Sequence, residues 1–349
     1  MYKKIKPTVK DVAKRAGVSP STVSRVISNN PKISKATRDR VLKEMEVLQF
    51  QPNAIARSLA RSRTHIIGIV MPSRETDVLL NPFFPEALRG IVTAAARYEY
   101  DVLLSTNSKN KEELDVIKNF IGGGKVDGLI LMQAQDDDPN IEYLSATNFP
   151  FALIGSCQGF SGNHVDNDNV QAAYDLTRHI LRTGKRKIYF ASGSLAYRVT
   201  QDRLAGFQKA LTDYGLPYSL DQVFTGQFDE ESGTRIAEEI FEKYETPDAV
   251  VATDDVIAFG LSRTIVDRGY RIPDDIAIGS FNNSILSRYS ESPLTTVDIR
   301  AFELGQKSVE LLMAAMDGGI RNGSAMIEYQ LIKRASTLGP VEDTKMKID

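Results

Sequence analysis

Side chains that can read the edges of DNA base pairs lie close together near the N-terminus. Pro20, Ser21 and Thr22 follow Ser19, and Arg25 comes about one helical turn later. A guanidinium group can donate two hydrogen bonds to guanine O6 and N7, a contact that discriminates between bases by about 1–3 kcal/mol. Pro20 offers only apolar contact, for example to a thymine methyl group, whereas the Ser21 hydroxyl suits several base edges. Arg25 is also compatible with a phosphate contact or a surface ion pair.

The residues ahead of this segment predict a short helix. Thr8 is a good N-cap, and Asp11 follows in the first turn, where an acid interacts favourably with the helix dipole. Gly17 ends the helix, because glycine adopts the left-handed cap conformation at the lowest cost. The apolar residues between them recur at helical spacing and form one stripe: Val9, Val12, Ala13 and Ala16.

A second helix is predicted to begin at Ser19 and Pro20, an N-cap followed by a proline at the first helical position. Its buried face consists of Val23, Val26 and Ile27. A third helix is expected from about residue 34 to residue 48, with Val41, Met45 and Leu48 facing inward. Two short helices around a tight glycine turn form a helix-turn-helix, whose second helix inserts its N-terminal residues into the major groove.

Charge is distributed unevenly along the chain. Residues 1–63 hold fifteen Lys and Arg against four acids, a net charge of +11, so the remainder carries −13 to give the total of −2. A head this basic is typical of phosphate binding, and the acidic body is expected to stay off the nucleic acid. The composition therefore favours a DNA-binding head joined to a body with another task.

Three stretches together resemble the start of a LacI/GalR-family transcriptional regulator: VKDVAKRAGVSPSTVSRVIS, QPNAIARSLA and HIIGIVMP. The resemblance extends to about Pro340. It implies that residues 52–63 form a hinge helix that orders on operator DNA, with Leu59 as the minor-groove wedge and Ala56 beside it. A wedge of this kind costs a few kcal/mol of unstacking but bends the duplex onto more protein surface. The alternative is an ordinary linker helix with Leu59 in a core, although nine residues are marginal as an isolated helix.

The DNA contacts implied by the helix-turn-helix and the resemblance come from both the head and the hinge. They are Thr8, Ser19, Pro20, Ser21, Thr22, Arg25, Asn53, Ala56, Arg57 and Leu59. The same reasoning divides the chain into a head at residues 1–51, a hinge helix at 52–63, an effector-binding and dimerisation body at 64–340 and a polar tail at 341–349.

The body alternates buried strands with helices, which predicts parallel, doubly wound α/β structure. The expected strands read IIGIV, DVLLS, VDGLILM, FALIG, KIYFAS, AVVAT and IAIGSF. Two helices carry a similar small motif, at residues 88–91 and 204–207, each behind a strand. This internal echo suggests two similar lobes with a ligand cleft between them. The resemblance implies the same: a two-lobed, periplasmic-binding-protein-like body.

The resemblance also implies a sugar site in that cleft. Its residues are Phe83, Phe84, Asp168, Arg203, Asp254, Phe281 and Asn282, within the segments Asn81–Phe84 and Val165–Asp168 among others. Carboxylates and a planar guanidinium bind paired hydroxyls, and an aromatic face packs against the C–H side of a sugar ring. Simpler roles remain open, namely a surface charge for Arg203, a helix N-cap for Asp254, a solvated loop for Asp166 and Asp168, and core packing for the Phe83–Phe84 pair.

Enzymatic chemistry finds little support in the sequence. His65, His164 and His179 lack metal-ligand spacing, and the lone Cys157 follows an apolar strand, which favours a packing role. The glycines at 122–124 are not followed by the Lys and Ser/Thr of a phosphate loop. A sugar kinase or hydrolase on this body is the rival interpretation, but it leaves the +11 head unexplained. No metal or cofactor is expected.

Several properties follow as expectations. One cysteine, no signal peptide and no long apolar run indicate a cytoplasmic protein without a membrane segment. A pseudo-palindromic operator requires a two-fold dimer, and the tail VEDTKMKID lacks the apolar heptads of a coiled coil, so the assembly is expected to be a homodimer. Within the family the chain most resembles maltose-operon regulators of Gram-positive bacteria, which implies a sugar effector such as maltose or another α-glucoside. Control by a phosphorylated carrier protein is the alternative.

Overall fold

The computed structural model describes residues 7–28, 30–50, 63–72, 78–105, 112–318 and 322–338. The chain divides into two compact units, Met1–Ile66 with Phe120–Asp127, and Ile67–Asn119 with Gly128–Asp349. Of the segments predicted from the sequence, most of the hinge (51–62) and the whole tail lie outside the described residues.

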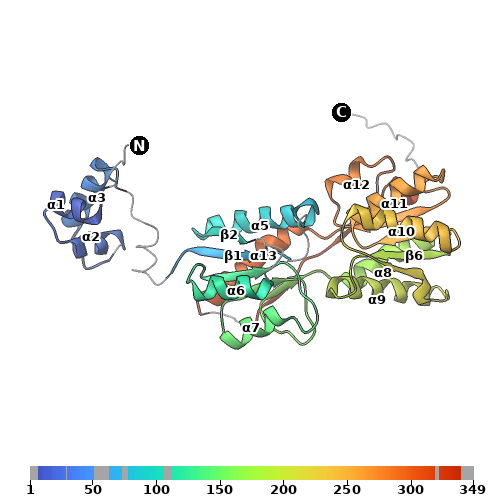
Figure 1. Ribbon diagram of the computed structural model, residues 1–349, viewed down its shortest axis with the longest axis horizontal. Coiled ribbons are helices and arrows are strands. Elements are labelled where there is room, and N and C mark those ends of the chain that lie inside the picture. Colours follow the sequence, from blue (N-terminus) through green and yellow to red (C-terminus); the bar gives the residue numbers. More distant parts are fainter. Residues whose placement is uncertain are drawn as a thin grey trace, which may run out of the picture. The chain divides into compact units, whose positions relative to one another are not determined.

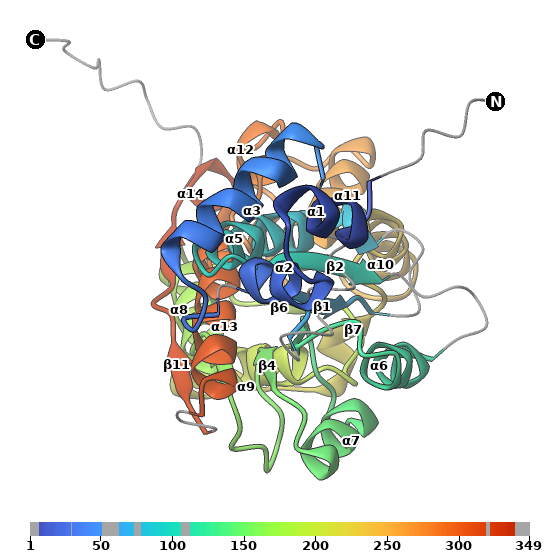
Figure 2. The same cartoon turned by 90° about the vertical axis from the view of Figure 1, so that its left-hand side faces the viewer.

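Three short helices make up the head (Figure 2): α1 (Val9–Ala16), α2 (Pro20–Ile27) and α3 (Lys35–Val47). Their fully buried side chains are Val12, Ala13, Ala16, Val23, Val26 and Val41, with Met45 and Leu48 packed against them. This small apolar core holds the helix-turn-helix in one arrangement. All three helices fall where the sequence predicts them.

The helix ends also follow the sequence signals. Thr8 and Asp11 form a reciprocal capping box at the start of α1, which satisfies two backbone N–H groups that the helix leaves unpaired. Gly17 has a φ of 63°, the left-handed conformation that ends α1 and opens the turn. The Ser19 hydroxyl caps α2, and Pro20 is its first residue. The structure therefore contains the tight turn between α1 and α2 that the sequence predicts for a helix-turn-helix.

The body contains two six-stranded sheets, one in each lobe. The strand order in lobe 1 is β11-β5-β4-β3-β1-β2, and β1, β3, β4, β5 and β11 pair in parallel. Its strands are β1 (Ile66–Val70), β2 (Asp101–Ser105), β3 (Gly128–Leu131), β4 (Phe151–Ile154), β5 (His164–Asp166) and β11 (Ser324–Met326). Its helices are η1 (Val78–Leu80), α5 (Phe83–Arg97), α6 (Glu113–Gly122), α7 (Pro139–Thr147) and α13 (Ala301–Met316).

Lobe 2 repeats this plan with the order β12-β10-β9-β8-β6-β7, and only β12 runs antiparallel to its neighbour. Its strands are β6 (Ile188–Ser192), β7 (Val223–Thr225), β8 (Ala249–Ala252), β9 (Ala277–Phe281), β10 (Thr295–Asp298) and β12 (Gln330–Ile332). Its helices are α8 (Asn169–Arg182), α9 (Arg198–Asp213), η2 (Leu220–Gln222), α10 (Glu230–Lys243), α11 (Asp255–Asp267), α12 (Ile285–Tyr289) and α14 (Ala335–Leu338). Helices cover both faces of each sheet (Figure 1). The doubly wound, two-lobed body is confirmed.

Glycines let paired helices approach closely and explain the echo motif. A Cβ added to Gly90 of α5 would lie 2.0 Å from the carbonyl oxygen of Phe302 in α13, and one on Gly206 of α9 would lie 2.1 Å from that of Val170 in α8. Any side chain at either position would therefore separate its helix pair. Gly90 and Gly206, which occupy the same place in the motifs at residues 88–91 and 204–207, allow the paired helices of each lobe to come into backbone contact.

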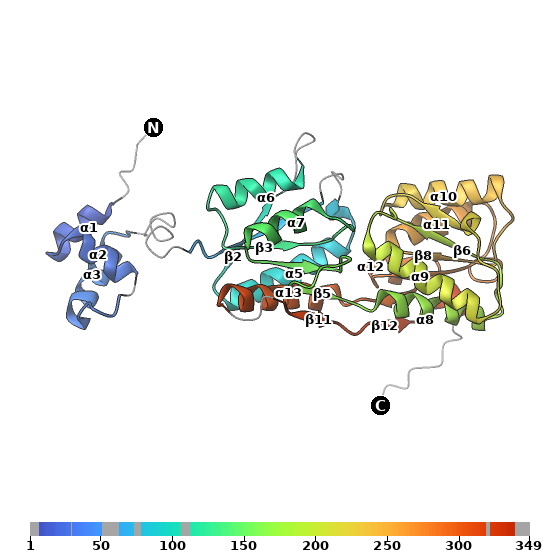
Figure 3. The same cartoon turned by 90° about the horizontal axis from the view of Figure 1, so that it is seen from below.

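The chain passes between the lobes three times, in the segments after β5, after β10 and after β11 (Figure 3). Parallel strands bring their carboxyl ends to one edge of each sheet, so side chains that follow the strands gather at the cleft.

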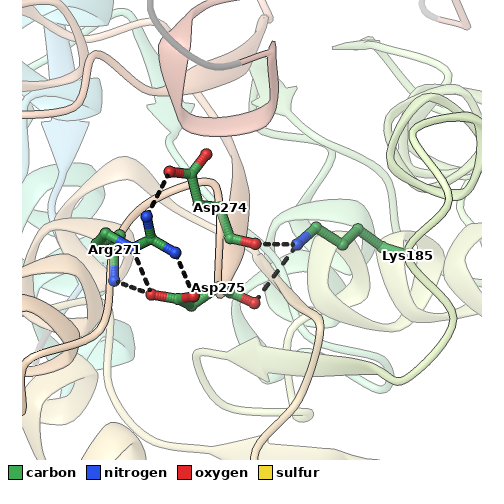
Figure 4. Close-up of polar contacts among 4 residues, drawn as sticks. All are labelled: Lys185, Arg271, Asp274 and Asp275. Carbon is green, nitrogen blue, oxygen red and sulfur yellow. Dashed lines mark hydrogen bonds and ion pairs between the residues drawn. The ribbon is translucent and has the colours of Figure 1, made fainter.

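The loop ahead of β9 is fixed at the opposite edge of lobe 2 (Figure 4). Arg271 forms a two-pronged pair with the Asp275 carboxylate, at 3.1 and 3.0 Å, while Lys185 donates to the Asp274 carbonyl at 2.9 Å. These contacts anchor β9, which carries Asn282 at its other end.

His179 lies in α8, where its ring contacts the Thr337 hydroxyl at 2.8 Å and is only 8% exposed. Burial lowers its pKa from 6.5 to about 4. As the pH falls, His179 therefore takes up a proton in the unfolded chain before it does so in the folded protein. Its contribution to the free energy of unfolding is complete above pH 6.5 and is lost between about pH 6.5 and pH 4.

We predict that His179→Gln, which keeps a neutral hydrogen-bonding group, removes this part of the acid sensitivity. Wild type should lose up to about 3 kcal/mol of unfolding free energy relative to the variant between pH 7 and pH 4. Urea unfolding at a series of pH values measures the difference. Parallel pH curves for the two proteins would show that His179 does not titrate differently on folding.

Candidate functional site

The N-terminus of α2 presents a cluster of hydroxyl groups. Ser19 Oγ accepts from the Thr22 backbone N–H at 3.1 Å and lies 2.7 Å from Ser21 Oγ and 2.9 Å from Thr22 Oγ1. Pro20 and Ser21 are exposed beside it. Ser19 therefore orders the end of the helix, and the neighbouring side chains are free to meet a base edge or a phosphate.

Arg25 and Arg15 have different surroundings in the head. Arg15 pairs with Glu44 of α3 at 2.7 Å, so its charge is engaged in holding the helices together. Arg25 is exposed and forms no side-chain hydrogen bond or ion pair with another described residue. This makes Arg25 available to an external acceptor. The predicted hinge contacts Asn53, Ala56, Arg57 and Leu59 lie outside the described residues.

A partly open cavity lies between the two lobes and is lined by residues of both. Five of the predicted effector residues line it: Phe83, Phe84, Arg203, Asp254 and Asn282. The other lining residues are mostly apolar or amide side chains, among them Asn81, Met132, Asp166, Asn167, Asn169, Val199, Phe228 and Ile299. The cleft that the internal echo and the resemblance predict is therefore present, and it is lined by both aromatic and polar side chains.

Asp254 organises the polar side chains of the cavity. Its Oδ1 accepts from the Val256 backbone N–H at 2.8 Å, which makes it the N-cap of α11, and its Oδ2 accepts from the amides of Asn81 at 2.9 Å and Asn282 at 2.8 Å. Burial raises its pKa to about 6, although these donors and the charge of Arg203 counteract the rise. Both roles considered for Asp254, N-cap and cavity residue, are thus compatible.

Arg203 is almost fully buried and is held by lobe 2. Its Nε donates to Asn169 Oδ1 at 3.0 Å, one terminal nitrogen donates to the Thr253 carbonyl at 2.6 Å, and the guanidinium stacks over the Phe281 ring at 4.1 Å. Burial lowers its pKa to about 10, opposed by Asp254 and Asp166. Arg203 therefore remains a cation at neutral pH, and its surface-charge interpretation is wrong.

Two predicted effector residues do not line the cavity. Asp168 is exposed and caps α8 by accepting from the Gln171 backbone N–H at 2.8 Å. Phe281 is fully buried beneath Arg203, where it supports the guanidinium from below. Asp166 takes the place expected for Asp168, because the last residue of β5 points to the cleft, and burial raises the pKa of its carboxyl group.

Asp255 supports the cavity from behind. Its carboxylate is fully buried and accepts from the Ser280 and Thr296 hydroxyls, at 2.5 and 2.8 Å, and from the Ser284 backbone N–H at 2.6 Å. The turn that it holds contains Asn282 and Asn283 with φ values of 98° and 49°, in the left-handed region. Such strain persists where surrounding contacts impose it. Asp255 thereby fixes the direction of the Asn282 side chain.

The comparison with protein families covers both parts of the chain. Residues 8–53 match the model of the bacterial regulatory proteins of the lacI family, and residues 177–337 match a periplasmic binding protein-like domain. The HTH-type transcriptional regulator MalR of Streptococcus pneumoniae serotype 4 is 38% identical over 327 residues, which span 93% of this chain and 97% of that protein. The chain belongs to the LacI family. It is a transcriptional regulator with a DNA-binding head.

Two solved structures of regulators match nearly the whole length of the chain. The lac repressor dimer bound to operator and the anti-inducer ONPF has a TM-score of 0.84 at 27% identity, covering 95% of this chain and 99% of that one. The transcriptional regulator CelR–cellobiose complex has a TM-score of 0.74 at 27% identity, with the same coverage.

Within the described residues of this LacI-family chain, no three His, Cys, Asp or Glu side chains are grouped as a metal site requires. His179 and Cys157 are separate from the cavity wall, and burial raises the Cys157 pKa. No described helix is both long and apolar enough to span a bilayer.

Arg25 offers a sharp test of base readout. We predict that Arg25→Lys, which keeps the charge but not the planar fork, leaves affinity for random DNA nearly unchanged and weakens operator binding about tenfold or more. Arg25→Ala should lower both. Fluorescence anisotropy with operator and scrambled duplexes at several salt concentrations separates these effects. Full operator binding by Arg25→Lys would indicate a phosphate contact instead.

Proposed function

We propose that this regulator represses carbohydrate-utilisation genes by binding a pseudo-palindromic operator as a homodimer. A neutral sugar in the cleft, maltose or another α-glucoside, changes its operator affinity. The protein acts in the cytoplasm, without enzymatic activity and without a cofactor. The segments 1–51, 52–63, 64–340 and 341–349 serve as head, hinge, effector and dimerisation body, and tail.

The charge of the cavity is the observation that carries this proposal. Among the residues that line it, Arg203 is the cation, and it is already engaged with protein acceptors, while two carboxylates, Asp166 and Asp254, line the same cavity. A phosphorylated ligand would face more negative than positive charge there. Hydroxyl groups can donate to the carboxylates and accept from Arg203, so a neutral polyhydroxylated ligand fits.

The aromatic side chains of the cavity support the same class of ligand. Phe83 and Phe84 meet edge to face at 5.2 Å, and Phe228 lines the cavity from lobe 2. Such rings pack against the C–H face of a pyranose, while the polar side chains bind its hydroxyls. The similarity to MalR and to a regulator solved with cellobiose favours a disaccharide.

An exposed apolar surface supports dimer formation. Leu79, Leu80 and Ile285 line one open groove across the two lobes, and Leu80, Ile285 and Tyr289 are 74%, 67% and 81% exposed. Large apolar side chains that remain exposed together are typical of protein–protein interfaces. The similar lac repressor structure is a dimer.

We predict that calorimetry detects maltose binding to wild type and that Arg203→Ala abolishes it. The loss follows because truncation removes the cation that faces Asp166 and Asp254 in a buried site. Lys209→Ala, an exposed position on the same helix, is the matched control and should bind as wild type does. Circular dichroism checks that each variant is folded.

Linkage supplies a second readout. If maltose lowers operator affinity a hundredfold, about 2.7 kcal/mol of coupling is required, and operator DNA must lower maltose affinity by the same factor. No sugar heat across a panel of mono- and disaccharides, together with tight binding of a phosphorylated carrier protein, would replace this proposal with the global-regulator alternative.

The hinge gives a separate prediction. Leu59→Ala should weaken operator binding while leaving random-sequence binding nearly intact, because only the bent operator accommodates a wedge. Anisotropy with both duplexes measures the two affinities. Equal losses on operator and random DNA would contradict the wedge assignment.

A further inference from the structure

Two asparagines donate to one oxygen of Asp254 and come from different lobes. Asn282 follows β9 of lobe 2, as Asp254 follows β8 of the same lobe, whereas Asn81 lies between η1 and α5 of lobe 1. Their amides reach Oδ2 at 2.8 and 2.9 Å. The Asn282 bond is internal to lobe 2, and the Asn81 bond crosses the cleft.

Asn81 is held in one orientation for this contact. Its Oδ1 accepts from the Phe83 backbone N–H at 3.0 Å, so Nδ2 faces lobe 2, where it also lies 3.4 Å from the Phe228 carbonyl oxygen. Asn81 is 5% exposed and Asp254 is 4% exposed. Hydrogen bonds to a charged group away from water are stronger than neutral or solvated ones.

The other contacts between the lobes are more exposed or join residues close in sequence, as where the Asn169 amide donates to Asp166 at 2.9 Å. Gln135 and Tyr197 form an isolated backbone bridge, and the next residues, Asp136 and Arg198, approach to 3.9 Å with side chains 26% and 34% exposed. Partly exposed ion pairs at this distance contribute little. Among the described side chains, Asn81 and Asp254 therefore make the best-buried polar link between the lobes.

This link leaves room for an effector. A carboxylate offers about four acceptor positions, and the donors Val256, Asn81 and Asn282 fill three of those on Asp254. One position on Oδ1 remains for a ligand hydroxyl. The cross-lobe bond can therefore persist when the cavity is filled.

We propose that Asn81 is a positioning residue that holds the lobes closed in the effector-free regulator. The apparent dissociation constant of a ligand that needs closed lobes equals the intrinsic value divided by the closed fraction. Asn81 thus raises effector affinity through lobe closure as well as through any contact of its own. The effector part of this inference rests on the proposed function, but the closure part does not.

The matched variants are Asn81→Ala and Asn282→Ala. Each removes one amide from the same oxygen of Asp254, but only the first breaks a bond between lobes. Spin labels at exposed Glu142 and Glu242, one in each lobe, with Cys157→Ser, report lobe separation in dimers that carry one labelled subunit. Effector-free Asn81→Ala should populate longer distances, while Asn282→Ala keeps the wild-type distribution.

A second variant tests the link between the lobes in case Asn81→Ala opens them only slightly. Asn81→Asp places a carboxylate opposite Asp254 and should open the lobes further than Asn81→Ala. For maltose, Asn81→Ala should raise the dissociation constant about tenfold, in line with the loss of one charge-assisted hydrogen bond. Circular dichroism confirms the fold of each variant.

The outcomes separate this proposal from the proposed function. Unchanged distances in both Asn81 variants, or equal opening in Asn81→Ala and Asn282→Ala, would overturn the role of Asn81 as a link between lobes. If Asn81→Ala opens the lobes but wild type binds no sugar, the link between the lobes would be supported. Only the proposal of a sugar effector would then be rejected.

Discussion

The body depends on one amide that joins the three segments crossing between the lobes. Asn167 lies in the first of them, and its Nδ2 donates to the carbonyls of Ile299 in the second, at 3.1 Å, and Ile327 in the third, at 2.8 Å. It is 4% exposed and Ile299 is 3% exposed, so the loss of this donor would remove a partner from a buried carbonyl. Because Asn167 also lines the cavity, a ligand there would lie beside the residue that ties the three segments together.

Acids have different tasks at the two edges of the sheets. At the amino edge, Asp127 ahead of β3 accepts from the backbone N–H groups of Thr64 and His65, and Asp248 ahead of β8 accepts from those of Arg186 and Lys187. These carboxylates fix strand starts. At the carboxyl edge, the carboxylates of Asp166 and Asp254 instead line the cavity between the lobes. The Asp127 contacts also hold residues 64 and 65 directly ahead of β1.

The sequence predicts those parts of the structure that local rules determine. Caps such as Ser19 and Asp254, and apolar strands of four or five residues, carry clear signals. Strands β5 and β7 have three residues each, too few for a pattern, and they become strands through their neighbours. The hydrogen bonds of Asn167 and the cross-lobe bond of Asn81 join residues far apart in the chain, so no local pattern reveals them. The sequence favours Asp168 over Asp166, because three residues are too few to show that a strand ends at Asp166 and directs it to the cleft.

The energies involved suit a switch. A buried hydrogen bond to a charged group contributes roughly 1.5–3 kcal/mol, and allosteric couplings are typically about 1–3 kcal/mol. The polar link between Asn81 and Asp254 is therefore of the same order as the coupling that a hundredfold change in operator affinity requires. Asn167 ties the crossing segments together independently of this link, so breaking the Asn81–Asp254 bond would leave that tie in place. A much larger set of buried contacts across the cleft would leave the lobes closed whatever the ligand.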